Sequence, residues 1–377
     1  MPVVSPQKLR SLDTPGVSTK KIYSSLDGIR GVGAILIVLR HAERYFGTVS
    51  FQESYLAVDL FFVLSGFVLG NAYDKQLRTS LSGWRFLLLR IVRLYPLYFL
   101  STICAIAAGW LGLRFGTSQM SHSMFVELAI VSLLMLPMLN SGGLYPLNPP
   151  AWSLFFELFS NLIYGYSAKS LNRKRIVSIM VISAVGLFGC AFATHTHHHP
   201  ITLNTGFSAS TSPYGIFRVM YSFMAGLLIC RTLQKRGESP FLIPPKYAGL
   251  TMALVIGAVV LILTAAPRPS LQFAFDLISI FLLFPVLTIM AIASDHAVEN
   301  NRLFAFLGAT SYGVYVLHTP LSRLVELVLQ HWAGIDVASY APWSGLVFLA
   351  GLLTLCWYLE KLVDLPIRRY FGGLLRK

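Results

Sequence analysis

The stretch L-D-G-I-R-G-V-G-A-I-L-I-V-L-R-H at residues 26–41 decides how the chain is interpreted. It is apolar enough for a membrane helix, yet it contains a cation, Arg30, and an imidazole, His41. Eleven positions at 100° per residue bring the two side chains to within about 20° of one helix face, roughly 16 Å apart along the axis. Ionisable groups are costly in hydrocarbon, so the pair predicts a functional pathway in the membrane.

The composition of all 377 residues points to the membrane as well. Hydrophobic residues make up 55% of the chain and charged residues 12%, and the mean hydropathy is +0.64. Soluble domains carry about 25% charged residues. The apolar segments are continuous and about 20 residues long, which is typical of helices and not of the alternating strands of a β-barrel. We therefore expect an all-α polytopic membrane protein.

Eleven apolar segments are candidate membrane spans. They lie near 28–47, 55–72, 85–111, 125–139, 152–168, 176–194, 215–233, 248–266, 271–293, 304–329 and 344–362. The segment 125–139 is short and contains Pro137, so its length fits a re-entrant or interfacial helix as well as a span.

The distribution of Lys and Arg decides between these possibilities. If 125–139 does not cross the membrane, ten spans leave both termini in the cytoplasm. Inner segments then hold 20 of the 30 Lys and Arg residues, whereas outer loops hold only Arg44, Arg114 and Arg268. This asymmetry follows the positive-inside rule. We expect about ten transmembrane helices, a cytoplasmic tail at 1–25 and a single transmembrane domain at 26–371, with no separate soluble domain.

The same topology explains the net charge of +14, because Lys and Arg cluster at the ends of apolar segments. Nucleic acid is therefore not an expected partner. The four cysteines stand singly in apolar segments, so neither a disulfide nor a zinc site nor a thiol nucleophile is expected. The run T-H-T-H-H-H-P at 194–200 has no acidic or cysteine partner nearby, and we expect no metal site there.

Four titratable side chains share one predicted depth near the outer face: His41, Asp59, Glu157 and His318. Histidine is the usual general base, and a carboxylate can fix its tautomer. The structural alternative is that the two carboxylates hold spans together and that His318 is a satisfied core histidine.

Arg90 and Arg93 lie nearer the inner side, three residues apart and therefore on one helix face. Two guanidinium groups make a good phosphate site. The alternative is that both side chains reach toward the interface and orient the helix.

Residues Ser311, Tyr315 and His318 follow the spacing i, i+4, i+7 and form a polar stripe that we expect to face the bundle. Tyr312 and Trp152 are consistent with aromatic packing or with a membrane-interface belt. Together, the polar groups fit group transfer from a cytosolic phosphate-bearing donor to an acceptor hydroxyl near the outer face. Proton-coupled transport would use many of the same residues.

The order of the motifs resembles the acyltransferase-3 family of integral membrane O-acyltransferases over residues 24–371. Six blocks carry the resemblance: L-D-G-I-R-G with Arg30 and His41, A-V-D-L-F-F-V-L-S-G-F-V-L at 57–69, R-I-V-R-L-Y-P-L-Y at 90–98, P-A-W-S-L-F-F-E at 150–157, L-G-A-T-S-Y-G-V-Y-V-L-H-T-P-L at 307–321 and E-K-L-V-D-L-P-I-R-R-Y at 360–370. Phe155 departs from a common Ser or Thr, and Val363 and Asp364 lengthen the last block.

The resemblance implies transfer of a short acyl group, most often acetyl from acetyl-CoA, to a hydroxyl of a carbohydrate or another acceptor. It implies an essential pair at Arg30 and His41 and a CoA-side role at Arg90 and Arg93. Further implied roles fall on Trp152, Ser153, Glu157, Ser311, Tyr312 and His318.

We therefore predict an O-acyltransferase in a bacterial cytoplasmic membrane, with cytosolic acyl-CoA as co-substrate and a carbohydrate or lipid-linked glycan acceptor at the outer side. His41 would deprotonate the acceptor or carry the acyl group, and Arg30 would hold the donor or stabilise negative charge. Glu157 or Asp59 would orient His41. Arg90 and Arg93, with Trp152 and Ser153, would bind acyl-CoA, and Ser311, Tyr312, Tyr315 and His318 would support the site. The alternatives are a proton-coupled exporter or flippase of a glycan or lipid-linked sugar, and a non-catalytic sensor.

Overall fold

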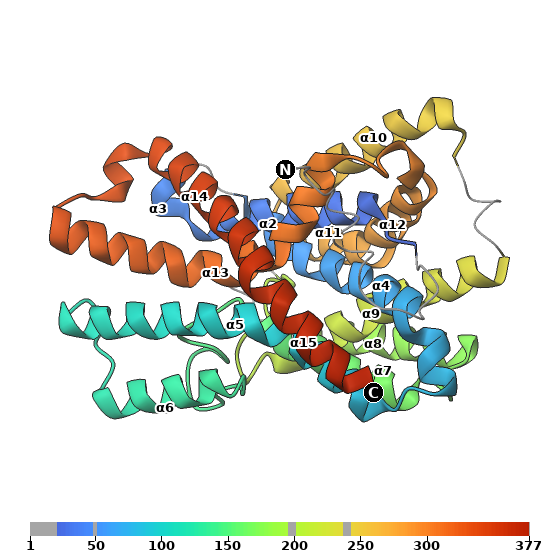
Figure 1. Ribbon diagram of the computed structural model, residues 1–377, viewed down its shortest axis with the longest axis horizontal. Helices are drawn as coiled ribbons and strands as arrows, with labels where there is room; N and C mark the ends of the chain where they lie inside the picture. Colours follow the sequence, from blue (N-terminus) through green and yellow to red (C-terminus); the bar gives the residue numbers. More distant parts are fainter. Residues whose placement is uncertain (1–20, 48–50, 195–200, 237–242, 377) are drawn as a thin grey trace.

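The computed structural model describes residues 21–47, 51–194, 201–236 and 243–376, and the regular elements in these ranges are all helices (Figure 1). The prediction of an all-α protein is thereby confirmed. The T-H-T-H-H-H-P run and most of the predicted N-terminal tail lie outside the described residues.

The helices follow one another along the chain with short connections. In the first half they are α2 (Ser24–His41), α3 (Glu43–Phe46), η1 (Gln52–Leu56), α4 (Ala57–Thr79), α5 (Gly83–Arg114), α6 (His122–Leu133), α7 (Ala151–Ser167) and α8 (Arg173–Thr194). In the second half they are α9 (Ser212–Arg236), α10 (Pro245–Thr264), α11 (Gln272–Ile278), η3 (Ser279–Leu283), α12 (Phe284–Ala293), η4 (Asp295–Ala297), α13 (Arg302–Ala333), η5 (Val337–Tyr340), α14 (Trp343–Leu359), η6 (Glu360–Asp364) and α15 (Leu365–Arg376).

Seven helical segments among the described residues are long and apolar enough to cross a membrane. They are Gln52–Thr79, Gly83–Arg114, Arg173–Ala193, Ser212–Arg236, Pro245–Thr264, Gln272–Ala293 and Trp343–Leu375. The other three predicted spans correspond to α2, α7 and α13. Their polar residues give the reason for the difference: these helices carry Arg30 and His41, Glu157, and the stripe from Ser311 to His318. The multiple apolar helices make this an integral membrane protein.

Helix α6 is the segment that we predicted to be re-entrant or interfacial. Its 12 residues extend about 18 Å, well short of the roughly 30 Å of a hydrocarbon core. The helix ends before Pro137, and tyrosine hydroxyls donate to the carbonyls that follow: Tyr98 to Ser132 at 2.6 Å, Tyr95 to Leu133 at 2.9 Å and Tyr145 to Met135 at 2.9 Å. These bonds satisfy backbone that leaves the helix beside α5.

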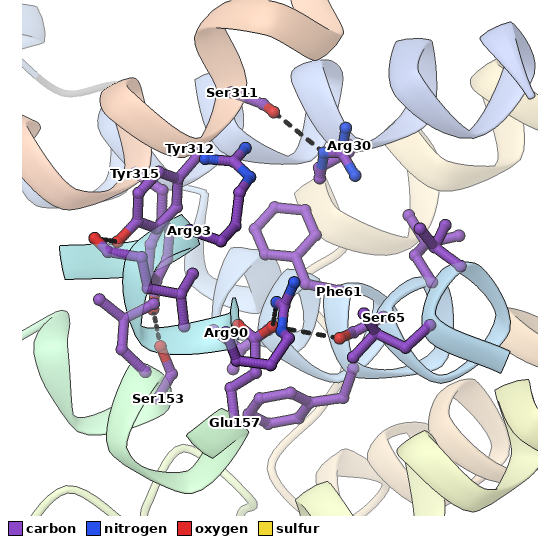
Figure 2. Close-up of a pocket in the computed structure, with 17 residues that line it drawn as sticks. Arg30, Phe61, Ser65, Arg90, Arg93, Ser153, Glu157, Ser311, Tyr312 and Tyr315 are labelled. Atoms are coloured by element: carbon purple, nitrogen blue, oxygen red, sulfur yellow. Dashed lines mark hydrogen bonds and ion pairs between the residues drawn. The ribbon is translucent and has the colours of Figure 1, made fainter. Parts of the chain in front are cut away.

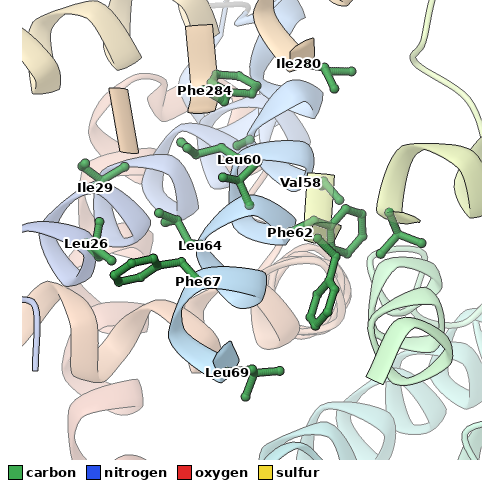
Figure 3. Packing of buried hydrophobic residues seen from close by; sticks show 14 of the residues in the cluster. Leu26, Ile29, Val58, Leu60, Phe62, Leu64, Phe67, Leu69, Ile280 and Phe284 are labelled. Atoms are coloured by element: carbon green, nitrogen blue, oxygen red, sulfur yellow. The ribbon is translucent and has the colours of Figure 1, made fainter. Parts of the chain in front are cut away.

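Helices α4 and α9 touch backbone to backbone at two glycines. A Cβ atom added to Gly66 would lie 2.0 Å from the carbonyl oxygen of Phe223, and one added to Gly226 would lie 2.0 Å from that of Val63. Small residues at such a crossing allow the close approach on which helix association in membranes depends. Around this crossing, apolar side chains of α2, α4 and α12 pack into a continuous core (Figure 3).

Helices α2 and α13 pack with a similarly close approach. A Cβ on Gly31 would lie 2.4 Å from the Cβ of Leu307, and a Cβ on Gly308 would lie 2.4 Å from the Cβ of Asp27. Because the contacts advance in the same direction along both helices, α2 and α13 run parallel. Their pairing brings the L-D-G-I-R-G block against the L-G-A-T-S-Y block.

Candidate active site

Five helices surround a cavity of about 170 Å³ in the interior of the bundle. Figure 2 shows its lining side chains, which come from α2, α4, α5, α7 and α13. Eight of the predicted site residues line it: Arg30, Arg90, Arg93, Ser153, Glu157, Ser311, Tyr312 and Tyr315. The structure therefore brings four separate sequence blocks to one place. The cavity wall carries three guanidinium groups and one carboxylate.

Glu157 is held by two neighbours on different helices. Arg90 donates from Nη2 to its Oε1 at 2.8 Å, and the hydroxyl of Ser65 donates to the same oxygen at 3.1 Å. The Nε of Arg90 is buried and has no hydrogen-bond partner among the described residues. Buried polar groups almost always find a partner, so this nitrogen is a donor suited to a ligand in the cavity.

Arg93 is paired with a residue from the end of the chain. Its Nη1 lies 3.0 Å from Oδ2 of Asp364, which is fully buried, and its guanidinium lies 5.2 Å from the ring centre of Tyr312. Arg368 donates to the same Asp364 oxygen at 3.2 Å. Asp364 belongs to η6, a π-helical turn that joins α14 to α15. The two residues that lengthen the last block lie in this turn, as π-bulges often do at functional sites.

Arg30 is fixed by α13 and by its own helix. Its Nε donates to the hydroxyl of Ser311 at 3.0 Å, and its Nη2 forms an ion pair with Asp27. Asp27 in turn packs against Gly308, where a larger residue would not fit. Ser311 donates to the carbonyl of Gly308 at 2.9 Å. The guanidinium is thus held at the cavity wall by contacts from both parallel helices.

His41 and His318 contact each other and do not line the cavity. Nδ1 of His41 lies 2.9 Å from Nε2 of His318. His41 is the last residue of α2 and is exposed, whereas His318 is 1% exposed. Tyr315 connects this pair to the cavity, because it lines the cavity and its ring centre lies 6.1 Å from that of His318.

Asp59 is committed to a different partner from the one we expected. Its two carboxylate oxygens accept bonds from Nε and Nη2 of Arg218, and both side chains are at most 1% exposed. Trp152 stacks over that guanidinium at 5.5 Å. Neither Asp59 nor Glu157 is placed on His41, because arginines bind both carboxylates. We therefore correct the expected orientation of His41 by a carboxylate: its partner is His318.

Ser153 and Tyr315 share a short hydrogen bond of 2.5 Å between their hydroxyls. The Tyr315 hydroxyl also donates to the carbonyl of Pro150 at 3.2 Å. This contact ties the start of α7 to α13 at the cavity wall. Arg218 was missed by the sequence analysis, although an arginine within an apolar segment is itself a signal of a buried partner.

No group of three His, Cys, Asp or Glu side chains suited to a metal ion occurs within the described ranges. The site's polar groups are therefore arginines, a carboxylate, hydroxyls and the histidine pair. These are groups for binding an anion and moving a proton.

Comparisons with known proteins agree with this arrangement of motifs. The model of the acyltransferase-3 family, described as an acyltransferase domain, matches residues 23–361. No solved structure matches the chain.

Three relatives match at least three quarters of the chain. A putative membrane-bound transacylase, BcsY, of Komagataeibacter xylinus is 24% identical, covering 97% of this chain and 87% of its own length. The exopolysaccharide production protein ExoZ of Rhizobium meliloti is 27% identical, covering 76% and 80%. The peptidoglycan O-acetyltransferase OatA of Listeria monocytogenes is 22% identical, covering 94% and 58%. With its six motif blocks gathered around one cavity and matched along almost its full length, this chain belongs to the acyltransferase-3 family and is an acyltransferase.

Proposed function

We propose that the protein is a membrane O-acyltransferase of a bacterial cytoplasmic membrane. It moves an acyl group, acetyl in the simplest case, from cytosolic acyl-CoA to a hydroxyl of a carbohydrate or glycan acceptor at the outer side. The observation that carries this proposal is the arginine-walled cavity, which shares helix α2 with an exposed histidine. One helix thereby joins an anion site to a base.

The proposed topology has ten spans and cytoplasmic termini, and the tryptophans of α5 support it. Trp84 and Trp110 are more than half exposed. Their separation of 26 positions corresponds to about 39 Å along a helix, similar to a bilayer with its interfaces. Tryptophan is enriched at these interfaces. With Trp84 at the inner one, Arg90 and Arg93 lie only about 9–14 Å deeper, within reach of a cytosolic donor.

The size and charge of the cavity suit the acyl end of the donor. Ligand pockets for drug-sized molecules measure about 300–1,000 Å³, so 170 Å³ accommodates part of acyl-CoA and not the whole molecule. Arg90 and Arg93 are positioned by Glu157 and Asp364 and present fixed donors to phosphate. The thioester then extends past Tyr315 toward the histidine pair.

In the proposed reaction, His41 accepts the proton of the acceptor hydroxyl as that oxygen attacks the thioester carbonyl. Arg30 holds the donor in the cavity while the reaction proceeds. A positioned general base contributes about 10²–10⁴-fold to a rate. The names of ExoZ and OatA refer to exopolysaccharide and peptidoglycan, which supports a glycan as the acceptor.

The proposal is tested with the full chain in proteoliposomes, supplied outside with labelled acetyl-CoA and inside with a glycan acceptor. Right-side and inverted orientations are separated by accessibility of an affinity tag. We expect CoA release that depends on the acceptor and acetyl ester on the glycan. Glycan movement across the bilayer without CoA release would support the exporter instead and overturn the proposal.

A further inference from the structure

We propose that His318 is a positioning residue that sets the tautomer of His41. In this arrangement His41 carries its proton on Nδ1 and presents the lone pair of Nε2 to the acceptor. The inference deepens the proposed function and rests on it, because it names the nitrogen that acts as the base.

The contacts of His318 assign its own proton first. Its Nδ1 lies 2.7 Å from the carbonyl oxygen of Tyr315 and 3.1 Å from that of Val314. Carbonyl oxygens only accept hydrogen bonds, so Nδ1 must carry the hydrogen. The ring is 1% exposed, and its hydrogen-bond partners within the described part of the chain are these carbonyls and His41. A buried charge without a counter-ion is strongly disfavoured, so His318 is neutral and its Nε2 is an acceptor.

The tautomer of His41 follows from that assignment. Its Nδ1 lies 2.9 Å from Nε2 of His318, and an acceptor at this distance requires a hydrogen on the facing nitrogen. The two rings are inclined by only 22°. Neutral His41 therefore has no hydrogen on Nε2. Because His41 is exposed, that nitrogen is accessible to a hydroxyl group.

The opposite arrangement conflicts with the observed contacts. If His41 accepted at Nδ1, His318 would have to donate from Nε2. A neutral His318 would then direct the lone pair of Nδ1 at two carbonyl oxygens. A doubly protonated His318 would be a buried cation. Both arrangements leave a buried polar group badly matched.

Each proton and bond in the resulting step is accounted for. The acceptor O–H gives its proton to Nε2 of His41, and the oxygen forms a bond to the thioester carbonyl carbon. The carbon–sulfur bond then breaks, and the thiolate of CoA takes the proton from Nε2. The products are an O-acyl ester and free CoA, and His41 returns to its starting tautomer. Nδ1–H remains on His318 throughout, which stabilises the imidazolium while it exists.

Two variants of His318 separate positioning from packing. His318→Leu removes the acceptor for Nδ1–H of His41, whereas His318→Gln provides a side-chain carbonyl that can accept the same bond. With purified protein in proteoliposomes, we expect His318→Leu to lower kcat about 100-fold or more and to leave the KM for acyl-CoA unchanged. His318→Gln should stay within about tenfold of the original kcat. Equal activity of His318→Leu and the unmodified enzyme would overturn the inference.

Nitrogen NMR of histidine-labelled protein in nanodiscs gives a readout that does not depend on activity. The His41 signals are assigned by their loss in His41→Ala. We expect a protonated Nδ1 and an unprotonated Nε2 in the unmodified enzyme, and a change of this pattern in His318→Leu. A hydrogen on Nε2 of neutral His41 in the unmodified enzyme would overturn the inference even if the Leu variant fails to fold. Absence of acyl transfer by the unmodified enzyme, with the expected NMR pattern, would instead contradict the proposed function alone.

Discussion

Arg93 and Asp364 form an ion pair of 3.0 Å between Nη1 and Oδ2, although 271 positions separate them in the chain. The π-helical turn that carries Asp364 is therefore part of the wall of the proposed donor site. The same carboxylate accepts a bond from Arg368. The end of the chain thus helps to hold a cavity built from the earlier helices.

The first prediction concerns the stability that this pair provides. Asp364→Asn leaves Arg93 without its carboxylate, and breaking a buried ion pair costs about 3–5 kcal/mol. We expect a clearly lower thermal unfolding temperature in detergent. The control is Lys361→Gln on the exposed side of the same turn, which should change stability by no more than about 0.5 kcal/mol. Equal unfolding temperatures for both variants would mean that the pair is not formed.

The second prediction concerns donor binding by Arg93. Hydrogen bonds to charged groups contribute about 1.5–3 kcal/mol, so Arg93→Ala should raise the KM for acyl-CoA about tenfold or more. The maximal rate should fall less than the affinity. An unchanged KM in a folded variant would assign Arg93 a purely structural role with Asp364.

The third prediction concerns the packing of α13 on α2. Gly308→Ala places a methyl group 2.4 Å from the Cβ of Asp27, so Asp27 and the Arg30 that it holds must shift. We expect a large loss of acyl transfer. The matched control is Gly257→Ala on α10, where a Cβ meets nothing within 4 Å. That control should retain activity, because Ala is a better helix former than Gly by about 1 kcal/mol. Comparable activity of the two variants would contradict the close packing.

The fourth prediction separates a structural from a catalytic Asp59. Asp59→Asn leaves buried Arg218 without its partner, and we expect destabilisation of about 3–5 kcal/mol. Replacing both residues by apolar ones, Asp59→Leu with Arg218→Met, should recover much of the stability and retain acyl transfer. If the double variant is as stable as the unmodified enzyme but inactive, Asp59 takes part in the chemistry.

Much of the fold could be predicted from the sequence because membrane helices announce themselves by length and apolarity. Arg30, Arg90, Arg93 and Glu157 could be identified because a charge in an apolar segment needs a reason. Helices with such residues were also the ones whose composition no longer satisfies a simple criterion for spanning. The polar residues that reveal the site therefore obscure the number of spans.

The pairings between distant helices could not be predicted from spacing within single segments. Asp59 and Glu157 were expected near His41 because they share its depth, but depth does not specify which helices are neighbours. Arg218 and Asp364 bind carboxylate and guanidinium partners that lie on other helices. Contacts of this kind depend on close crossings such as that of α4 and α9, which only the assembled bundle reveals.

The most direct test of the central claim is acyl transfer by His41→Ala. The full-length variant and the unmodified enzyme are reconstituted in equal amounts, and acceptor-dependent CoA release is measured at saturating acyl-CoA. We expect the rate to fall about 10²–10⁴-fold while the unfolding temperature and membrane insertion stay unchanged. A properly inserted His41→Ala variant that transfers acyl groups at the original rate would contradict the proposed role of His41.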